Sequence, residues 1–298
     1  MEGRNLKESI FDEEFYQKLN KLNLGIRMRL SQGQTGARKS SAKGTSVEFS
    51  DFREYMLGDD IRRIDWNAYG RMDKLYIKQF MEEKEGMFHI LLDCSKSMDF
   101  GEKKKSVFAM QVAAALSYVV LNNLDRVYLS KLKEENVVCE KGMTGKSSFK
   151  KIIASLEQTE FDGNTNLNKN IATFPLHGKG VTIIISDFLD PKGLDEAISY
   201  LLYRQQQIIL IQILAREELE IGLDGTLSLV DLETKENIKI TMSKAAVDAY
   251  EQQLIKLQNH LEDLAKKYGF LYMQGCSDES LEQFIFEELK HTGFLHSK

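Results

Sequence analysis

The sequence predicts a doubly wound α/β fold, in which helices cover both faces of a largely parallel sheet. From residue 88 to the C-terminus, short apolar runs alternate with segments of helical periodicity. Two of the runs, at residues 88–92 and 181–185, are followed closely by the carboxylates of Asp93 and Asp187. Continuous apolar runs are typical of strands that are buried on both faces. Open α/β sheets bind ligands at the carboxyl ends of such strands, so both carboxylates are candidate site residues.

Composition indicates a soluble globular protein. The 298 residues are enough for one large domain with a sizeable extension. The net charge of −5 gives no general attraction to nucleic acid or to anionic membranes. No stretch approaches the roughly 18 consecutive apolar residues of a membrane span, and the first residues lack the apolar core of a signal peptide. The 3 cysteines lie far apart in the sequence, which favours a reducing, cytoplasmic location without disulfides.

Residues 1–86 are predicted to form an N-terminal helical and extended extension. Apolar residues at helical spacing predict a short amphipathic helix over residues 12–24. Residues 25–44 are basic, contain several glycines and have no acid. We expect this segment to be either a docking surface for an acidic partner or a solvated loop. It lacks interleaved aromatic residues, so no nucleic-acid partner is expected. Its candidate partner-binding residues are Arg27, Arg29, Arg38 and Lys39.

Residues 48–80 interleave charged and aromatic residues and include the only tryptophan, Trp66. Several aspartates alternate with Arg62 and Arg63, which predicts internal ion pairs that add little stability when exposed. Alternation over residues 76–80 predicts extended structure. We expect a packed polar-aromatic collar, and we take Arg62, Arg63 and Trp66 as further candidate partner-binding residues.

The elements after Asp93 follow from periodicity. An alanine-rich helix over residues 102–123 would pack closely on a sheet, and one apolar face predicts a helix over residues 147–158. Alternation predicts a hairpin over residues 226–241. The other expected elements are a strand over 126–132, a short antiparallel edge strand over 136–141, a helix ending near 174, a strand over 180–187, a helix over 194–204, a strand over 207–214, a helix over 243–268, a strand over 270–273 and a helix over 281–289.

Three loops at predicted strand or helix ends offer oxygen ligands. Asp93, Ser95 and Ser97 form the pattern Asp-x-Ser-x-Ser, Thr165 lies in a short polar loop, and Asp187 follows the second apolar run. If the two apolar strands are neighbours, the three loops meet at one edge of the sheet. Hard cations take carboxylate and hydroxyl oxygens, so we expect a Mg²⁺ site, with Mn²⁺ or Ca²⁺ as alternatives. Few charged ligands would leave a position free for an acidic group of another molecule. A strand end followed by helix-capping serines is the simpler alternative.

A metal-dependent hydrolase or phosphatase that uses Asp93 as its nucleophile is the main alternative function. Phosphatases of the dehalogenase type need a second aspartate two residues later, where this chain has Ser95. Residues 142–147 end in Gly-Lys-Ser, but Glu140 replaces the first glycine that a P-loop requires. Ser147 is instead expected to cap a helix. No histidine has zinc-ligand spacing, so we expect no enzymatic activity.

In its oxygen-rich loops the chain resembles the von Willebrand factor A family. Asp93-x-Ser95-x-Ser97, Thr165 and Asp187 match all parts of that family's metal-ion-dependent adhesion site, in the same order. The resemblance covers roughly residues 87–298, which we take as one domain. It implies a mostly parallel six-stranded sheet flanked by helices and a non-catalytic, Mg²⁺-dependent protein-binding site. Cys94 lies between ligand positions and is expected to point into the core.

The preceding block resembles the hallmark of the bacterial domain-of-unknown-function 58 family, in Glu48-Phe49-x-Asp51-x-Arg53-Glu54-Tyr55 and in Gly58-Asp59-Asp60-x-Arg62-Arg63-Ile64-Asp65-Trp66. Together the two resemblances extend over nearly the whole chain. Members of the family are usually found beside MoxR-type AAA+ ATPases, which implies an adaptor or assembly factor with such an ATPase as its partner. Many members carry N-terminal membrane spans, whereas none is expected here.

Overall fold

The chain separates into two compact units, each described by itself. The computed structural model describes residues 10–20, 47–72, 74–82, 85–134, 136–190, 192–220, 226–230, 237–241 and 244–285. Of the described residues, those from 47 to 85 form the smaller unit, and residues 10–20 together with those from 86 to 285 form the larger unit. The first helical segment therefore belongs to the larger unit, although the sequence analysis placed it in the extension.

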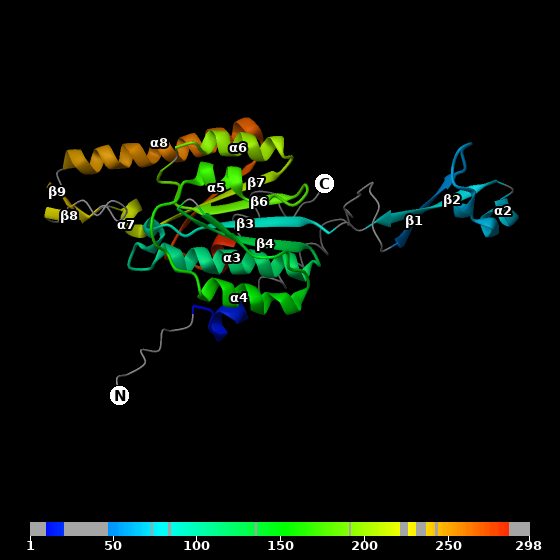
Figure 1. Ribbon diagram of the computed structural model, residues 1–298, viewed down its shortest axis with the longest axis horizontal. Helices are drawn as coiled ribbons and strands as arrows, with labels where there is room; N and C mark the ends of the chain where they lie inside the picture. Colours follow the sequence, from blue (N-terminus) through cyan, green and yellow to red (C-terminus); the bar gives the residue numbers. More distant parts are fainter. Residues whose placement is uncertain are drawn as a thin grey trace. The chain divides into compact units, whose positions relative to one another are not determined.

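The larger unit is built on a six-stranded sheet with the order β10-β7-β6-β3-β4-β5. All neighbouring strands run parallel except β5, which is antiparallel to β4 at the edge of the sheet. The expected doubly wound, mostly parallel sheet is thus confirmed (Figure 1). The strands are β3 (Met87–Asp93), β4 (Arg126–Lys133), β5 (Asn136–Cys139), β6 (Val181–Ser186), β7 (Gln207–Leu214) and β10 (Leu271–Cys276).

Helices cover both faces of this sheet, as Figure 1 shows. One face carries α3 (Lys105–Asn122) and α4 (Phe149–Glu157). The other carries α5 (Leu167–Thr173), α6 (Leu194–Tyr203) and α8 (Lys244–Tyr268). The hairpin of β8 (Thr226–Val230) and β9 (Asn237–Thr241) precedes α8, as expected. Each apolar strand serves both layers, because successive side chains of a strand point to opposite faces.

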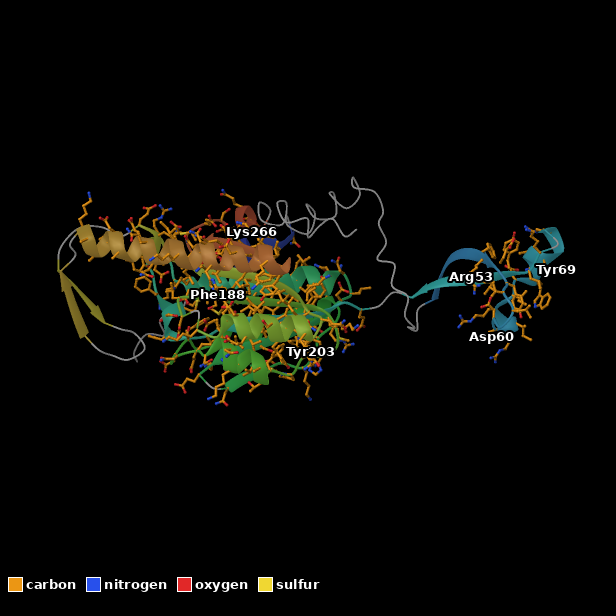
Figure 2. The ribbon with its side chains drawn as sticks, turned by 90° about the horizontal axis from the view of Figure 1, so that it is seen from above. Arg53, Asp60, Tyr69, Phe188, Tyr203 and Lys266 are labelled. Carbon is orange, nitrogen blue, oxygen red and sulfur yellow. The ribbon has the colours of Figure 1, made fainter. Side chains whose placement is uncertain are left out.

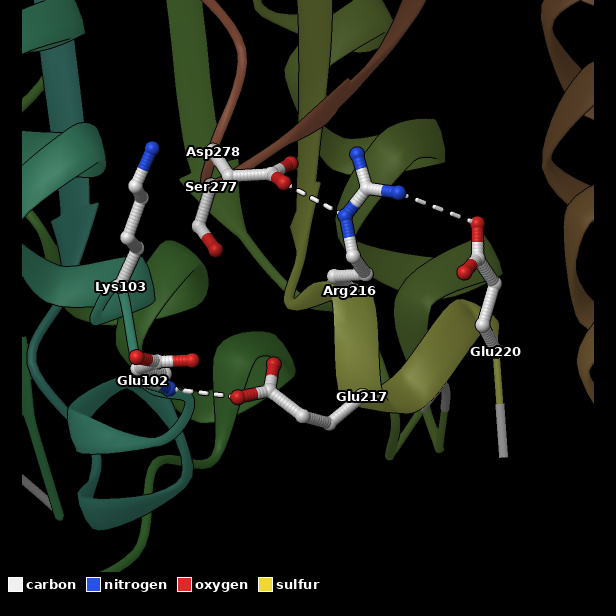
Figure 3. A pocket seen from close by; sticks show the side chains of 7 residues that line it. All are labelled: Glu102, Lys103, Arg216, Glu217, Glu220, Ser277 and Asp278. Carbon is white, nitrogen blue, oxygen red and sulfur yellow. Dashed lines mark hydrogen bonds and ion pairs between the residues drawn. The ribbon is translucent and has the colours of Figure 1, made fainter. Parts of the chain in front are cut away.

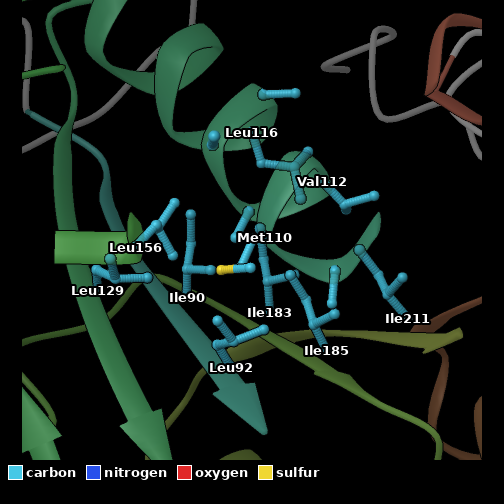
Figure 4. Close-up of a cluster of buried hydrophobic side chains, with 14 of the residues drawn as sticks. Ile90, Leu92, Met110, Val112, Leu116, Leu129, Leu156, Ile183, Ile185 and Ile211 are labelled. Carbon is cyan, nitrogen blue, oxygen red and sulfur yellow. The ribbon is translucent and has the colours of Figure 1, made fainter. Parts of the chain in front are cut away.

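The two hydrophobic cores show this alternation directly. Ile90 and Leu92 of β3 are buried among the side chains of α3 and α4, whereas Leu91 is buried on the opposite face. Figure 4 shows Met110 and Val112 of α3 close to the branched side chains of the sheet. The alanines of α3 are fully buried, so this helix approaches the sheet closely. Among the described residues, only α3 has the length and hydropathy of a membrane span, and 72% of it is buried as a core helix.

The N-terminal helical segment, residues 13–20, packs on the α3 and α4 layer. Asp12 starts the helix, because its Oδ1 accepts a hydrogen bond from the Phe15 backbone N–H at 2.8 Å. Phe11, Phe15 and Leu19 are buried in the same core as α3 and α4. This segment therefore covers apolar surface of the larger unit, and its contribution comes from burial rather than from helix propensity alone.

The smaller unit is an antiparallel hairpin with two short helical turns between its strands. Strand β1 (Val47–Glu54) pairs with β2 (Tyr76–Glu82), and η1 (Ile61–Arg63) and α2 (Trp66–Met72) lie between them. One of the expected internal ion pairs is present, between Arg62 and Asp60, and Arg53 forms a further pair with Asp59 that was not expected. Figure 2 shows Arg53, Asp60 and Tyr69 together in this unit.

One expected helix cap is wrong. Helix α4 begins at Phe149, after the 3-10 turn η3 (Lys146–Ser148), so the N-cap position falls on Ser148 and not on Ser147. The Ser148 hydroxyl donates to the Thr144 carbonyl at 2.7 Å and makes no capping bond. A 3-10 turn supplies the local hydrogen bonds that a cap would otherwise supply.

His89 makes folding dependent on pH. It is fully buried in β3, its ring stacks on Tyr128, and Nε2 lies 3.2 Å from the His177 carbonyl oxygen. Burial lowers the pKa of His89 to about 4. Between the ordinary pKa of 6.5 and that value, the unfolded chain binds a proton that the folded chain excludes.

We therefore expect the free energy of unfolding to fall by roughly 3 kcal/mol as the pH is lowered from 6.5 to 4. Urea unfolding at a series of pH values measures this loss. The variant His89→Phe should remove most of it, whereas His260→Gln, at a side chain that is 44% exposed, should keep it. An unchanged pH dependence in His89→Phe would contradict the assignment.

A candidate metal-binding site at the carboxyl edge of the sheet

The two carboxylate-ended strands are direct neighbours. Strands β3 and β6 pair in parallel register, with Leu92 opposite Ile185. Asp93 is the last residue of β3, and Asp187 directly follows β6. From β3 the sheet continues through β4 on one side and through β6 on the other. This is the switch point of the doubly wound topology, where such sheets form their ligand crevice.

The first loop brings three of the predicted ligands together. Asp93 and Ser95 are buried, and Ser97 is half-buried in the 3-10 turn η2 (Lys96–Asp99). The Ser95 backbone N–H donates to Asp93 Oδ1 at 2.9 Å, and the Oγ atoms of Ser95 and Ser97 are 3.0 Å apart. Neighbouring oxygens around an octahedral Mg²⁺ are about 2.9 Å apart, because Mg–O distances are about 2.0–2.1 Å. The two hydroxyls therefore have the spacing of adjacent Mg²⁺ ligands.

The second loop is held against the first by backbone hydrogen bonds. The Lys96 N–H donates to the Gly163 carbonyl at 2.8 Å, and the Asp162 N–H donates to the Cys94 carbonyl at 3.0 Å. Thr165 is half-buried and lies close enough to Asp93 for its hydroxyl to favour the ionised carboxylate. The loop of residues 162–166 is thus held beside Asp93, although it lies about 70 positions later in the sequence.

The third loop contributes a hydrogen-bond donor that the sequence analysis missed. The Ser186 hydroxyl donates to Asp93 Oδ2 at 2.6 Å and accepts from the Phe188 N–H at 3.1 Å. Asp187 Oδ1 accepts from the Leu189 N–H at 3.2 Å. Ser186 escaped notice because a serine at the end of an apolar strand carries no motif of its own.

Asp93 is a buried carboxylate that lacks a cationic partner in the described part of the chain. It is 4% exposed. Burial, and then the negative charge of Asp187, raise the pKa of Asp93, and its hydrogen bonds oppose this only in part. A divalent cation would remove the repulsion between the two carboxylates. No group of three or more His, Cys, Asp or Glu side chains in the described residues could hold a metal, so the Ser and Thr hydroxyls are needed. The oxygen donor set fits Mg²⁺.

Asp187 does have a cationic partner, and this too was missed. Lys105 Nζ donates to Asp187 Oδ2 at 2.8 Å and to Glu218 Oε1 at 2.6 Å. Burial by itself would lower the pKa of Lys105, but the two carboxylates raise it above its ordinary value. In the sequence, Lys105 follows Lys103 and Lys104 and looks like part of an exposed basic run. No local pattern distinguishes it.

Cys94 lies as expected. It is fully buried, and its Sγ donates to the Leu92 carbonyl at 3.4 Å. Burial raises the pKa of the Cys94 thiol to about 12, so the sulfur stays protonated at neutral pH and is a poor nucleophile. The thiol therefore belongs to the core beneath the loop.

A separate charged pocket of about 330 Å³ lies at the ends of β7 and β10 (Figure 3). It contains Arg216, which is paired with Asp278 and with Glu220. None of the five predicted metal ligands lines this pocket. Its lining residues are Glu102, Lys103, Arg216, Glu217, Glu220, Ser277 and Asp278.

Three of the predicted partner-binding residues lie in a different unit from the oxygen-rich loops. Arg62, Arg63 and Trp66 belong to the smaller unit, where Trp66 is 64% exposed and Arg62 is paired with Asp60. The other predicted residues, Arg27, Arg29, Arg38 and Lys39, lie outside the described residues.

Comparison with known proteins gives the following matches. The family model described as "Protein of unknown function DUF58" matches residues 51–260. The uncharacterized protein Rv1480 of Mycobacterium tuberculosis is 25% identical over 236 residues, which cover 77% of this chain and 74% of that protein. The conserved hypothetical protein BatB of Bacteroides thetaiotaomicron aligns at a TM-score of 0.43 and 15% identity, covering 70% of this chain and 99% of BatB. The SpRpn10 VWA domain aligns at a TM-score of 0.37 and 11% identity, covering 67% and 92%.

Replacing Asp93 by Asn should separate stability from cation binding. The substitution removes the buried charge. The amide oxygen can still accept from the Ser95 N–H, and the amide NH2 can donate to the Ser186 hydroxyl, which reverses the direction of that hydrogen bond. The folded chain holds the Asp93 proton to a higher pH than the unfolded chain, so the penalty grows as the pH rises and is fully present above the folded pKa. We expect Asp93→Asn to melt at a higher temperature than wild type in EDTA at neutral pH.

The same variant should lose its response to Mg²⁺. In wild type, Mg²⁺ at a hundredfold excess over its Kd should add about 2.7 kcal/mol to the free energy of unfolding. Thermal melts with Mg²⁺ and with EDTA measure this gain. Asp190→Asn, at an exposed carboxylate of the same loop as Asp187, is the matched control and should keep the full response. Equal Mg²⁺ stabilisation of Asp93→Asn and wild type would refute the site.

Proposed function

This chain belongs to the DUF58 protein family, and from that premise we propose that it is a non-enzymatic, Mg²⁺-dependent protein-binding module. The observation that carries the proposal is the convergence of Asp93, Ser95, Ser97, Thr165 and Asp187 at one edge of a von Willebrand factor A-like sheet. These residues come from three loops that are far apart in the sequence.

The chain's own residues would perform the binding step as follows. Ser95, Ser97 and Thr165 would supply neutral oxygens to the cation, and Asp93 and Asp187 would supply charge directly or through water. When bound, the cation supplies an electrophilic centre that accepts an acidic side chain from a partner. Ser186 and the Ser95 backbone N–H hold both oxygens of Asp93, so the carboxylate keeps one orientation.

We propose a MoxR-type AAA+ ATPase as the partner class, on the strength of the sequence resemblance. The smaller unit offers a second surface, since Met56, Leu57, Ile61 and Trp66 are all more than half exposed. The cysteines are free thiols, which supports the proposed cytoplasmic location. The function proposed is therefore that of an adaptor or assembly factor.

The contacts of Asp93 argue against the alternative, a hydrolase or phosphatase that uses this carboxylate as a nucleophile. Both of its oxygens already accept hydrogen bonds, and the residue is 4% exposed. The position two residues later, where a general acid would be needed, is Ser95, whose hydroxyl contacts Ser97. A buried, doubly held carboxylate suits cation binding better than attack on a substrate.

Binding to a purified MoxR-type ATPase from the same organism tests the function. We expect binding by the full chain with Mg²⁺ and at least a roughly tenfold loss in EDTA or in Thr165→Val. Thr173→Val, on the exposed surface of α5, is the matched control and should bind as wild type does. Biolayer interferometry gives the affinities. Binding that ignores both EDTA and Thr165→Val would refute metal dependence, and phosphate release from an ester that requires Asp93 would establish the enzyme instead.

A further inference from the structure

A buried lysine pairs with Asp187, one of the two carboxylates of the candidate site. Lys105 is the first residue of α3 and is 0% exposed at its side chain. Its two carboxylate partners, Asp187 and Glu218, are 5% and 11% exposed. Breaking such a pair is unfavourable, because a buried charge without a partner is strongly destabilising. Asp187 therefore has a cationic partner within the chain itself.

Contacts between the segment before α3 and helix α7 keep the Lys105 ammonium beside Asp187 and Glu218. Helix α7 (Arg216–Leu219) carries Glu218, whose Oε2 accepts from the Ala215 N–H at 2.8 Å. The neighbouring Glu217 accepts from the Glu102 N–H at 2.6 Å, and Figure 3 shows this contact. Gly101 permits the close approach, because a Cβ there would lie 2.9 Å from the Ala215 Cβ. These contacts hold the segment before α3 against the start of α7.

The buried charged groups around Lys105, taken with Asp93, have a net negative charge. Asp93, Asp187 and Glu218 carry three negative charges when ionised, and Lys105 carries one positive charge. The sum is −2, which one Mg²⁺ would neutralise. Lys105 is shared between Asp187 and Glu218, so it can leave the first carboxylate and remain paired with the second.

We propose that Lys105 is a built-in competitor of the divalent cation for Asp187. In the cation-free protein its ammonium holds Asp187, and on cation binding it gives up that carboxylate and stays with Glu218. Glu218 is then the residue that keeps Lys105 paired in the loaded state. This inference rests on the cation site of the proposed function and assigns two residues that set its affinity. It implies that the chain alone binds Mg²⁺ weakly, so that a partner's acidic side chain adds to capture.

A purely structural ion pair would leave a different signature. If Lys105 only joins α3, α7 and β6, its removal changes stability but leaves the affinity for the cation unchanged. A change in net charge could also alter the affinity for the cation, because removing any lysine near the site makes the site more negative. The double variant Lys105→Met/Glu218→Gln avoids this, since it removes one charge of each sign and keeps the site at −2. The double variant removes a buried ion pair as a whole, and proteins tolerate this better than the loss of one partner alone.

Calorimetric titration of MgCl₂ into the full chain tests the proposal. We expect the double variant to bind Mg²⁺ roughly tenfold more tightly than wild type or better, because the competing contact at 2.8 Å is gone. The control Lys266→Met/Glu262→Gln removes an exposed ion pair of α8, also one charge of each sign, and should bind as wild type does. Thermal melts with and without Mg²⁺ give an independent readout.

Each outcome decides between the hypotheses. Tighter binding by Lys105→Met/Glu218→Gln, together with unchanged binding by Lys266→Met/Glu262→Gln, supports competition. Equal or weaker binding by the double variant overturns it, while wild-type binding that depends on Asp93 leaves the proposed function standing. Failure of both proteins to bind Mg²⁺ at millimolar concentration overturns the proposed function as well.

Discussion

The structure of the site depends on one costly arrangement, a carboxylate placed inside the protein at the end of a central strand. Water would solvate Asp93 far better than the apolar strands around it do, and Asp187 repels it from the neighbouring strand. The surrounding groups reduce this cost without cancelling it, since Ser186 and the Ser95 backbone donate to Asp93. The remaining cost is seen in the pKa of Asp93, which stays above its ordinary value.

The sheet topology is what brings these groups together. The chain leaves β3 toward β4 and returns through β6 on the other side, so loops that are far apart in sequence share one edge. Helix α3 begins at the same edge and sends Lys105 to Asp187, 82 positions away. The core of the larger unit fixes these strand ends in position, because both faces of β3 are buried. The site is therefore a property of the fold and not of any single loop.

The parts that sequence could predict are those with a local signature. Apolar runs of strand length located β3 and β6, and the spacing of Asp93, Ser95 and Ser97 located the first loop. The contacts of Lys105 carry no such signature, since Glu218 lies 113 positions away and only the tertiary structure joins them. The N-terminal helix was recognised as a helix, but periodicity does not say which apolar surface covers Phe15. The Ser147 cap failed because a 3-10 turn supplied the local hydrogen bonds instead.

The N-terminal helix has a consequence for how the chain is synthesised. Residues 10–20 are synthesised before α3 and α4, whose side chains form the surface that covers Phe11, Phe15 and Leu19. The Ile10 carbonyl accepts a hydrogen bond from the side chain of Gln111, which lies 101 positions later in the chain. The smaller unit emerges in between, so it can fold while an apolar helix upstream of it still has nowhere to dock. During that interval the side chains of Phe11, Phe15 and Leu19 lack the surface that buries them in the folded chain.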